Sequence, residues 1–302
     1  MEVQIANPIY DVVFKYMMED NAVAKLLISS IIGEEVVSLE PKPQEHTRDK
    51  VTIGDSESSL TVYRLDFSAK IKVPDGQKLV HIEMQKANMP TDIIRFRRYL
   101  GEQYIDPSNT INTADGMKGL QIYCLYFLGE ALGIYDTPVL EINPNVKDVA
   151  TSKIIKEKSD FIESLHHKTW IIQISCLKDR RRNELEQLLS VFDQSNITAD
   201  WHILNVKEEN FPEKFRPIIR RLKSAASNPK VKRQMKAEDE FIRYLRDWLQ
   251  VERNKALEKS KKTIEEKDKS LAEKDKSLAE KDKSLAEKDK EIEALKRQLK
   301  KQ

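Results

Sequence analysis

Apolar residues recur at helical spacing through the N-terminal segment and fall into two sets. Each set occupies one face of a helix: Val12, Val13, Tyr16 and Met17 in the first, and Val23, Leu26, Leu27 and Ile31 in the second. Gly33 follows the second set, at the position where a glycine commonly ends a helix. The pattern therefore predicts two consecutive helices, the second of which ends at Gly33.

Strict alternation of apolar and polar residues predicts a β-hairpin farther along the chain. Residues 60–73 show a strand pattern that alternates with period two over 63–73, and the alternation resumes through residues 79–85. Pro74-Asp75-Gly76, between the two segments, is typical of a turn. We expect two long antiparallel strands here.

The remaining pattern continues to mix helices and strands. Further helices are predicted over residues 91–104, 182–192, 215–224 and 237–257, and further strands over 120–128, 137–141 and 170–176. This mixture predicts an α/β fold whose mixed central sheet is flanked by helices on both faces. We expect one domain over 1–250, with a core at about 7–130 and an extension of helices and strands over 131–250, followed by a separate tail.

The tail, residues 251–302, is a charged heptad repeat built on KDKSLAE, and its spacing predicts a helix. Its apolar residues lie seven apart: Leu257, Ile264, Leu271, Leu278, Leu285, Ile292 and Leu299. A stable coiled coil normally has apolar residues at both a and d, whereas placing this stripe at a puts lysine at d in four heptads. Two interpretations stay open. The tail is a weak coiled coil that joins copies of the chain, or a solvated helix stabilised by Glu–Lys neighbours at about 0.2–0.5 kcal/mol per pair.

The net charge of the chain is small and unevenly distributed. The 302 residues include 52 Lys and Arg against 50 Asp and Glu. Residues 252–302 hold 17 basic and 13 acidic residues, which leaves 35 basic and 37 acidic residues in 1–251. Binding to nucleic acid through overall basicity is therefore excluded, and any such binding must use local patches.

Cysteine usage and hydropathy limit the class of protein further. Cys124 and Cys176 show none of the spacings of a zinc site, and two cysteines do not make a disulfide framework. The longest apolar run, residues 122–128, is much shorter than a bilayer span of about 20 residues. The N-terminus lacks the pattern of a signal peptide. We expect a soluble, cytoplasmic protein without membrane partners.

The polar face of the predicted hairpin carries candidate chemistry. Alternation puts Asp66 on that face of the first strand, and Glu83 and Gln85 on that face of the second. A turn at 75–76 pairs position 66 with 85, whereas another even loop length pairs it with 83. In either register two carboxylates could converge on a hard cation such as Mg²⁺. The alternative is an ordinary ribbon with a solvated polar face, in which His81 is structural.

Four short motifs place this hairpin in a wider context: Asp11-Val-Val-Phe14-Lys15, Arg64-Leu-Asp66, Ile82-Glu83-Met84-Gln85 and Arg95-Phe-Arg97-Arg98-Tyr99. In this order the chain resembles the recombination-promoting nuclease and transposase branch of the PD-(D/E)xK superfamily. That branch carries a D-x-x-F-K start, a strand aspartate, E-x-Q in place of E-x-K, and a following R-x-x-x-Y helix. The resemblance covers residues 7–130 and implies a restriction-endonuclease-like fold.

The resemblance also implies roles for individual residues. Asp66 and Glu83 become the carboxylates that hold Mg²⁺, or another divalent cation such as Mn²⁺ or Ca²⁺, with the main-chain carbonyl of Met84 completing the coordination. Gln85 takes the place of the usual lysine and orients a water molecule. Asp11 becomes an accessory acid. The implied activity is metal-dependent hydrolysis of DNA with little sequence specificity, linked to mobile elements or recombination.

Basic and aromatic residues outside the hairpin are the predicted contacts to DNA phosphates. They are Lys15, Arg95, Arg98, Tyr99, Arg220 and Arg221. The last two belong to the most basic stretch of the predicted domain, residues 213–236, with nine basic residues and one acid. For the predicted helix over 91–104 and for this stretch, the alternative is a solvated charged surface. Two competing hypotheses remain for the whole chain. It is a catalytically silent DNA-binding or self-assembling module, or it is an oligomeric adaptor dominated by its tail.

Overall fold

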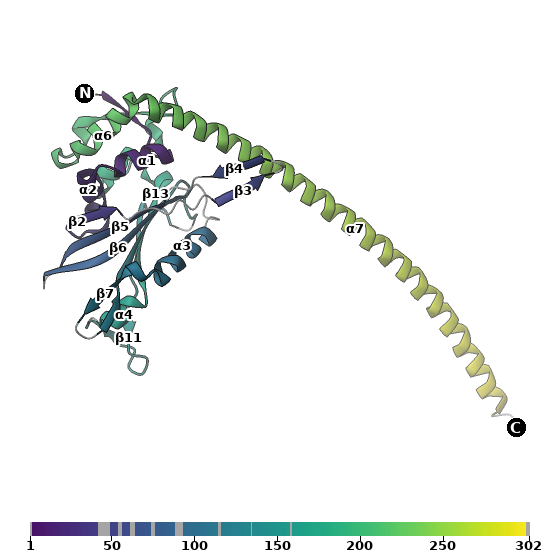
Figure 1. The fold of residues 1–302 in the computed structure, drawn as a ribbon. Coiled ribbons are helices and arrows are strands. Elements are labelled where there is room, and N and C mark those ends of the chain that lie inside the picture. Colours follow the sequence, from purple (N-terminus) through teal and green to yellow (C-terminus); the bar gives the residue numbers. More distant parts are fainter. Residues whose placement is uncertain are drawn as a thin grey trace. The chain divides into compact units, whose positions relative to one another are not determined.

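The computed structural model describes residues 2–41, 49–53, 56–60, 64–73, 76–87, 93–113, 116–133, 135–157 and 159–299 (Figure 1). The chain forms two compact units, Met1–Glu238 and Asp239–Gln302. The predicted division between residues 250 and 251 falls within a long helix, α7, which spans Pro229–Leu299.

A six-stranded mixed sheet is the centre of the first unit. Its strands, in spatial order, are β10 (Val139–Ile142), β13 (His167–Gln173), β9 (Gln121–Leu128), β6 (Gly76–Ala87), β5 (Arg64–Val73) and β2 (Val36–Pro41). β9 runs parallel to both of its neighbours, β6 and β13, and the other pairs are antiparallel. The prediction of an α/β fold with a mixed central sheet is confirmed.

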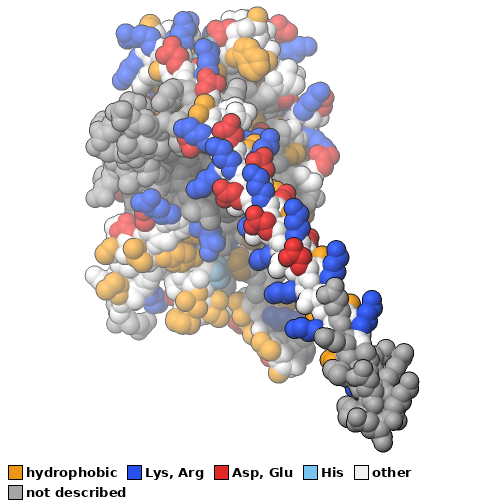
Figure 2. Space-filling view, turned by 90° about the vertical axis from the view of Figure 1, so that its right-hand side faces the viewer, with side chains coloured by type: hydrophobic (Ala, Val, Ile, Leu, Met, Phe, Trp, Pro, Cys, Tyr) orange, Lys and Arg blue, Asp and Glu red, His pale blue; other side chains and the backbone are white. Residues whose placement is uncertain are grey.

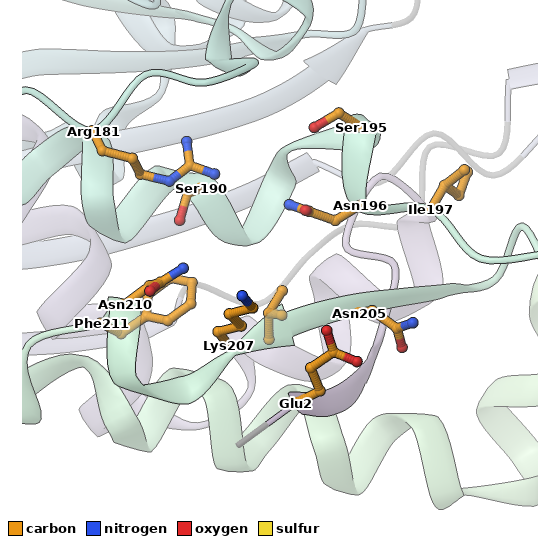
Figure 3. Close-up of a pocket in the computed structure, with 11 residues that line it drawn as sticks. Glu2, Arg181, Ser190, Ser195, Asn196, Ile197, Asn205, Lys207, Asn210 and Phe211 are labelled. Atoms are coloured by element: carbon orange, nitrogen blue, oxygen red, sulfur yellow. The ribbon is translucent and has the colours of Figure 1, made fainter.

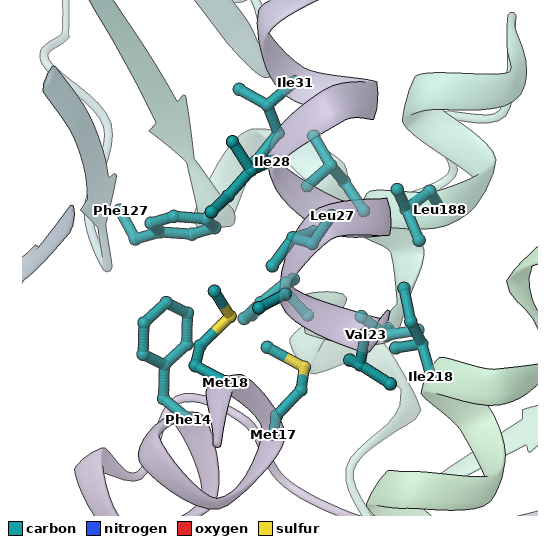
Figure 4. Close-up of a cluster of buried hydrophobic side chains, with 14 of the residues drawn as sticks. Phe14, Met17, Met18, Val23, Leu27, Ile28, Ile31, Phe127, Leu188 and Ile218 are labelled. Atoms are coloured by element: carbon teal, nitrogen blue, oxygen red, sulfur yellow. The ribbon is translucent and has the colours of Figure 1, made fainter. Parts of the chain in front are cut away.

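Helices α1 (Asp11–Met18), α2 (Asn21–Ile32), α5 (Glu184–Leu189) and α6 (Arg216–Ser227) supply the apolar side chains that pack on one face of this sheet. The Asp20 side chain caps α2 by accepting from two main-chain N–H groups, and Gly33 ends it with φ 69°. Figure 4 shows how α2 directs Leu27 and Ile28 into the space between Phe127 of β9 and Leu188 of α5. The two N-terminal helices lie where the apolar spacing predicted them.

The other face of the sheet is packed by α3 (Ile93–Ile105), whose Leu100 contacts an apolar cluster on β9 (Figure 1). All eight residues of β9 are buried. This explains why its sequence is a continuous apolar run from Ile122 to Leu128, since a strand that is covered on both faces has no solvent side to keep polar.

Several short elements surround the sheet. The two-stranded pairs are β1 (Glu2–Ala6) with β14 (Ile203–Lys207), β3 (Asp49–Ile53) with β4 (Ser56–Leu60), β7 (Thr110–Thr113) with β8 (Gly116–Gly119), and β11 (Val146–Lys147) with β12 (Ile154–Ile155). The short helices are α4 (Asp160–Ser164), η2 (Pro107–Asn109), η3 (Ile174–Leu177), η4 (Ser190–Phe192), η5 (Gln194–Asn196), η6 (Glu208–Asn210) and η7 (Glu213–Phe215). The pairing of β1 with β14 joins the N-terminus to a segment some two hundred residues away.

The helix α7 begins directly after α6. Asn228 separates the two, and its Oδ1 accepts from the main-chain N–H groups of Lys230 (2.9 Å) and Val231 (3.4 Å). The pattern predicted this helix only from residue 237, because Asn228-Pro229 interrupts the periodicity; proline is nevertheless favourable in a first helical turn. None of the helices in the described ranges has the length and hydropathy that crossing a membrane requires.

Candidate active site on the β5–β6 hairpin

The register of the hairpin makes the two acidic positions direct partners. Val73 pairs with Gly76, so two residues connect the strands, and Asp66 pairs with Glu83. This is the alternative register of the sequence analysis; the one with a turn at 75–76 would have paired Asp66 with Gln85. Directly opposed residues on antiparallel strands have Cβ atoms about 4.5–5.5 Å apart. The side chains of Asp66, Glu83, Met84 and Gln85 lie outside the described part of the structure, so the geometry given is that of their backbone positions.

Alternation assigns the positions of the hairpin to the two faces of the sheet. Phe67 and Ile82 are register partners and are buried in the main core. Positions 66, 83 and 85 alternate with them and so belong to the opposite face. On that face, the row of register partners Asp66, Glu83, Cys124 and Thr169 crosses four strands.

The α3 side of the sheet carries a polar pair that the sequence motifs did not indicate. The Tyr104 hydroxyl lies 3.0 Å from Nδ1 of His167, at the start of β13. Burial raises the pKa of Tyr104, and the nearby Cys124 adds to this shift. Burial, with a smaller contribution from His166, lowers the pKa of His167 and favours the neutral imidazole at pH 7. Because the two residues are 63 positions apart, no local pattern could have paired them.

Asp11 and Lys15 lie on the first helix, which packs on the other face of the sheet from positions 66 and 83. The main-chain N–H of Asp11 donates to both carboxylate oxygens of Glu238 at 3.0 Å. Tyr10 provides no side-chain cap for α1, so Glu238 supplies the negative charge that a helix N-terminus favours. Glu238 thus caps the start of α1 through the main chain of Asp11.

The residues predicted to contact phosphates lie on three helices of the first unit: α1, which carries Lys15, and α3 and α6. On α3, Arg98 is exposed, with its Nε 3.4 Å from Oε1 of Glu102, and the side chains of Arg95 and Tyr99 lie outside the described part. On α6, Arg220 is exposed. Arg221 instead donates to the main-chain oxygen of Tyr16 from Nε (2.9 Å) and Nη2 (2.7 Å), and its guanidinium lies 3.7 Å from the centre of the Tyr16 ring. Arg221 therefore links α6 to α1.

A polar cavity of about 380 Å³ lies apart from the hairpin, between the β1–β14 pair and the η4–η5 segment (Figure 3). Arg181 and Ser190 line one wall, and Glu2, Asn205 and Lys207 line the other. Arg181 is held in the wall by an ion pair of 2.9 Å with the buried Asp193. The lining carries both signs of charge and none of the predicted site residues, so it favours no particular ligand charge.

The described side chains include no group of three or more His, Cys, Asp or Glu residues placed to hold a metal ion. Asp66 and Glu83 are not among those side chains. No protein-family model, curated protein or solved structure matches this chain.

Proposed function

We propose that the first unit is a metal-dependent DNA endonuclease with a restriction-endonuclease-like fold. The observation that carries the proposal is the register of β5 and β6, in which Asp66 and Glu83 are direct partners on antiparallel strands. Gln85, two positions farther along the same strand, shares their face. This arrangement supports the resemblance to the E-x-Q branch of PD-(D/E)xK nucleases.

The donor set suits a hard divalent cation. Mg²⁺ prefers oxygen ligands, takes one or two carboxylates and keeps several waters. Asp66, Glu83 and the main-chain carbonyl of Met84 would hold Mg²⁺, Mn²⁺ or Ca²⁺. When bound, such an ion supplies Lewis-acid chemistry at a phosphate and acidifies a bound water.

The uncharged side chain of Gln85 limits the charge that the protein itself can place beside the phosphate. A lysine at this position would place a positive charge beside the phosphate, whereas the amide of glutamine can only accept or donate hydrogen bonds and so orient a water. Most of the charge stabilisation would then depend on the cation. We therefore expect cleavage to depend more steeply on the divalent ion than in an E-x-K enzyme.

Basic residues near the hairpin face provide a surface for the DNA backbone. Lys70 is exposed on β5, at a position of the same face as Asp66, and Arg97 and Arg98 are exposed on α3. Such side chains contact phosphates without reading bases, which fits low sequence specificity. Arg220 belongs to the helical layer on the opposite face, so a phosphate contact there would involve a different stretch of DNA.

Plasmid nicking tests the assignment. Supercoiled DNA is incubated with the full chain and Mg²⁺, Mn²⁺ or Ca²⁺, and Asp66→Asn, Glu83→Gln and the double variant are compared with the wild type. We expect each variant to lose nicking. Glu40→Gln is the matched control, because Glu40 is an exposed acid on the neighbouring strand β2 and should keep activity. Equal nicking by the wild type and the double variant would refute the proposal.

The alternative function is a catalytically silent DNA-binding or self-assembling module on the same fold, with self-assembly through the C-terminal helix. The uncharged Gln85 and the slight acidity of residues 1–251 favour it. It predicts retention on DNA that weakens steeply with salt, because each phosphate contact releases counterions. Salt-sensitive binding without cleavage in any of the three ions would favour this alternative. Loss of all DNA binding at low salt would remove both functions.

A further inference from the structure

A single row of apolar side chains runs along the second unit and is half-exposed throughout. Its members are Leu257 (52% exposed), Ile264 (54%), Leu271 (57%), Leu278 (56%), Leu285 (58%) and Ile292 (48%). The other side chains of this part of α7 are mostly charged, and Figure 2 shows Lys and Arg interspersed with Asp and Glu along it. An apolar row at heptad spacing supplies one of the two apolar positions, a and d, through which a helix packs against another helix in a coiled coil.

The row has a basic flank and an acidic flank. In four successive heptads a lysine follows the apolar residue by three positions and an aspartate follows it by four, as in Leu271, Lys274 and Asp275. At 3.6 residues per turn, the lysines lie about 60° to one side of the row and the aspartates about 40° to the other. The pairs are Lys267/Asp268, Lys274/Asp275, Lys281/Asp282 and Lys288/Asp289.

We infer that this face binds the same face of a second copy of the chain, with the two helices parallel. In a parallel pair, equivalent positions lie opposite each other, so each apolar residue meets its own counterpart. The basic flank of one helix then faces the acidic flank of its partner on both sides of the seam. In an antiparallel pair that kept the two apolar rows in contact, the flanks would meet lysine to lysine and aspartate to aspartate, and like charges that face each other are unfavourable.

The orientation does not depend on how the heptad is assigned. If the row occupies a, the lysines occupy d and the aspartates e. Each d lysine of a parallel pair then faces the same lysine of the partner, but it also packs beside the partner's e aspartate, which offsets the like charge. If the row occupies d, the aspartates occupy a and the lysines g, and each facing pair of a aspartates is offset in the same way, with Lys274 beside Asp275 of the other helix. In an antiparallel pair a layers face d layers, so each leucine would meet a charged side chain instead of a leucine.

The association is two-stranded and concentration-dependent. One apolar layer per heptad buries far less surface than the two layers of an ordinary coiled coil. The other core position of each heptad is charged. This favours a pair of helices over a bundle of three or four, because long side chains at the edge of a two-helix seam can reach water. The inference deepens the self-assembly through the C-terminal helix that is named in the alternative function, and it is independent of DNA cleavage.

Disulfide trapping in the full chain tests the orientation. Leu257→Cys and Ile292→Cys are made separately in a Cys176→Ser background, in which the remaining Cys124 is buried. The two sites are 35 residues apart, which is roughly 50 Å along a helix, so a cysteine can reach its counterpart only if the helices are aligned. We expect each variant to form disulfide dimers with itself under mild oxidation without DNA. Crosslinks that form only when the two variants are mixed would show antiparallel pairing and overturn the inference.

A matched pair of substitutions tests the apolar row. Leu278→Asn should weaken dimer formation, measured by sedimentation, by at least about tenfold, since it removes a buried leucine layer. Glu280→Asn lies two residues away on the far side of the helix and should leave association unchanged. No dimer at high protein concentration, or equal association of the two variants, would refute the inference. Nicking by the same preparations reports separately on the hairpin site, so the two failures are distinguishable.

Discussion

Replacing Phe127 by alanine tests whether the sheet and the helices on its main face share one core. Phe127 is fully buried on the central strand β9. Its ring centre lies 5.1 Å from that of Phe14 on α1 and 5.3 Å from that of Phe192 in η4. One side chain therefore links three segments that are far apart in the sequence.

The expected loss follows from this packing. Truncation of a buried phenylalanine to alanine costs about 3–5 kcal/mol through lost burial and the cavity that remains. Each aromatic pair adds about 0.5–1.5 kcal/mol beyond area burial, so we expect Phe127→Ala to fall in the upper part of the range. Phe161→Ala is the control. Phe161 is 71% exposed, and surface changes of this kind usually stay within about 0.5 kcal/mol.

Urea unfolding followed by tryptophan fluorescence is the appropriate assay. Trp170 is 4% exposed and lies on β13, beside β9, so its emission reports on the sheet. Far-ultraviolet circular dichroism is less suitable because α7 alone contributes 71 helical residues. In Phe127→Ala the urea concentration at the midpoint of unfolding should fall, with little change in the slope of the free energy against urea concentration. A loss below about 1 kcal/mol, or one equal to that of Phe161→Ala, would refute the described core, because no well-packed site tolerates such a truncation.

Three further predictions concern single residues. Arg221→Ala should lower the free energy of unfolding by about 1–3 kcal/mol in the same assay, because it removes the guanidinium bonds to Tyr16, whereas Arg220→Ala should not. Gly33→Ala should cost about 1 kcal/mol, since φ of 69° strains any residue with a Cβ. The pKa of His167 is lower in the folded state than in the unfolded chain, so on acidification the unfolded chain binds the proton first. The free energy of unfolding should therefore fall as the pH drops below about 6.5. His167→Gln should flatten this fall, measured by urea unfolding at several pH values between 7 and 5. Equal losses for both arginine variants, no loss at Gly33, or an unchanged acid slope would contradict these assignments.

Local pattern predicted the elements well where one face or both faces of an element are buried. The alternation around Phe67 and Ile82 predicted the hairpin, and the apolar run of β9 predicted a strand. It could not fix the hairpin register, because pairing Asp66 with Glu83 or with Gln85 leaves the parity of every side chain the same. The length of the connecting loop decides between them.

Contacts between distant segments were beyond the reach of the sequence. Nothing local in Glu2–Ala6 indicates that it pairs with Ile203–Lys207. The cap that Glu238 provides to α1 joins residues 227 positions apart. These contacts depend on how the helical layer folds back over the sheet, which single-sequence periodicity does not encode.

The Asp66–Glu83 pair is the centre of the functional account, and Mn²⁺ bound to the protein tests it most directly. Crystals of the full chain soaked in Mn²⁺ should show an anomalous peak between the two carboxylates, close to the carbonyl of Met84. The peak should vanish in Asp66→Asn combined with Glu83→Gln, while Glu40→Gln keeps it. Wild-type crystals in which the two carboxylates point to opposite faces of the sheet, with no ion between them, would contradict the account.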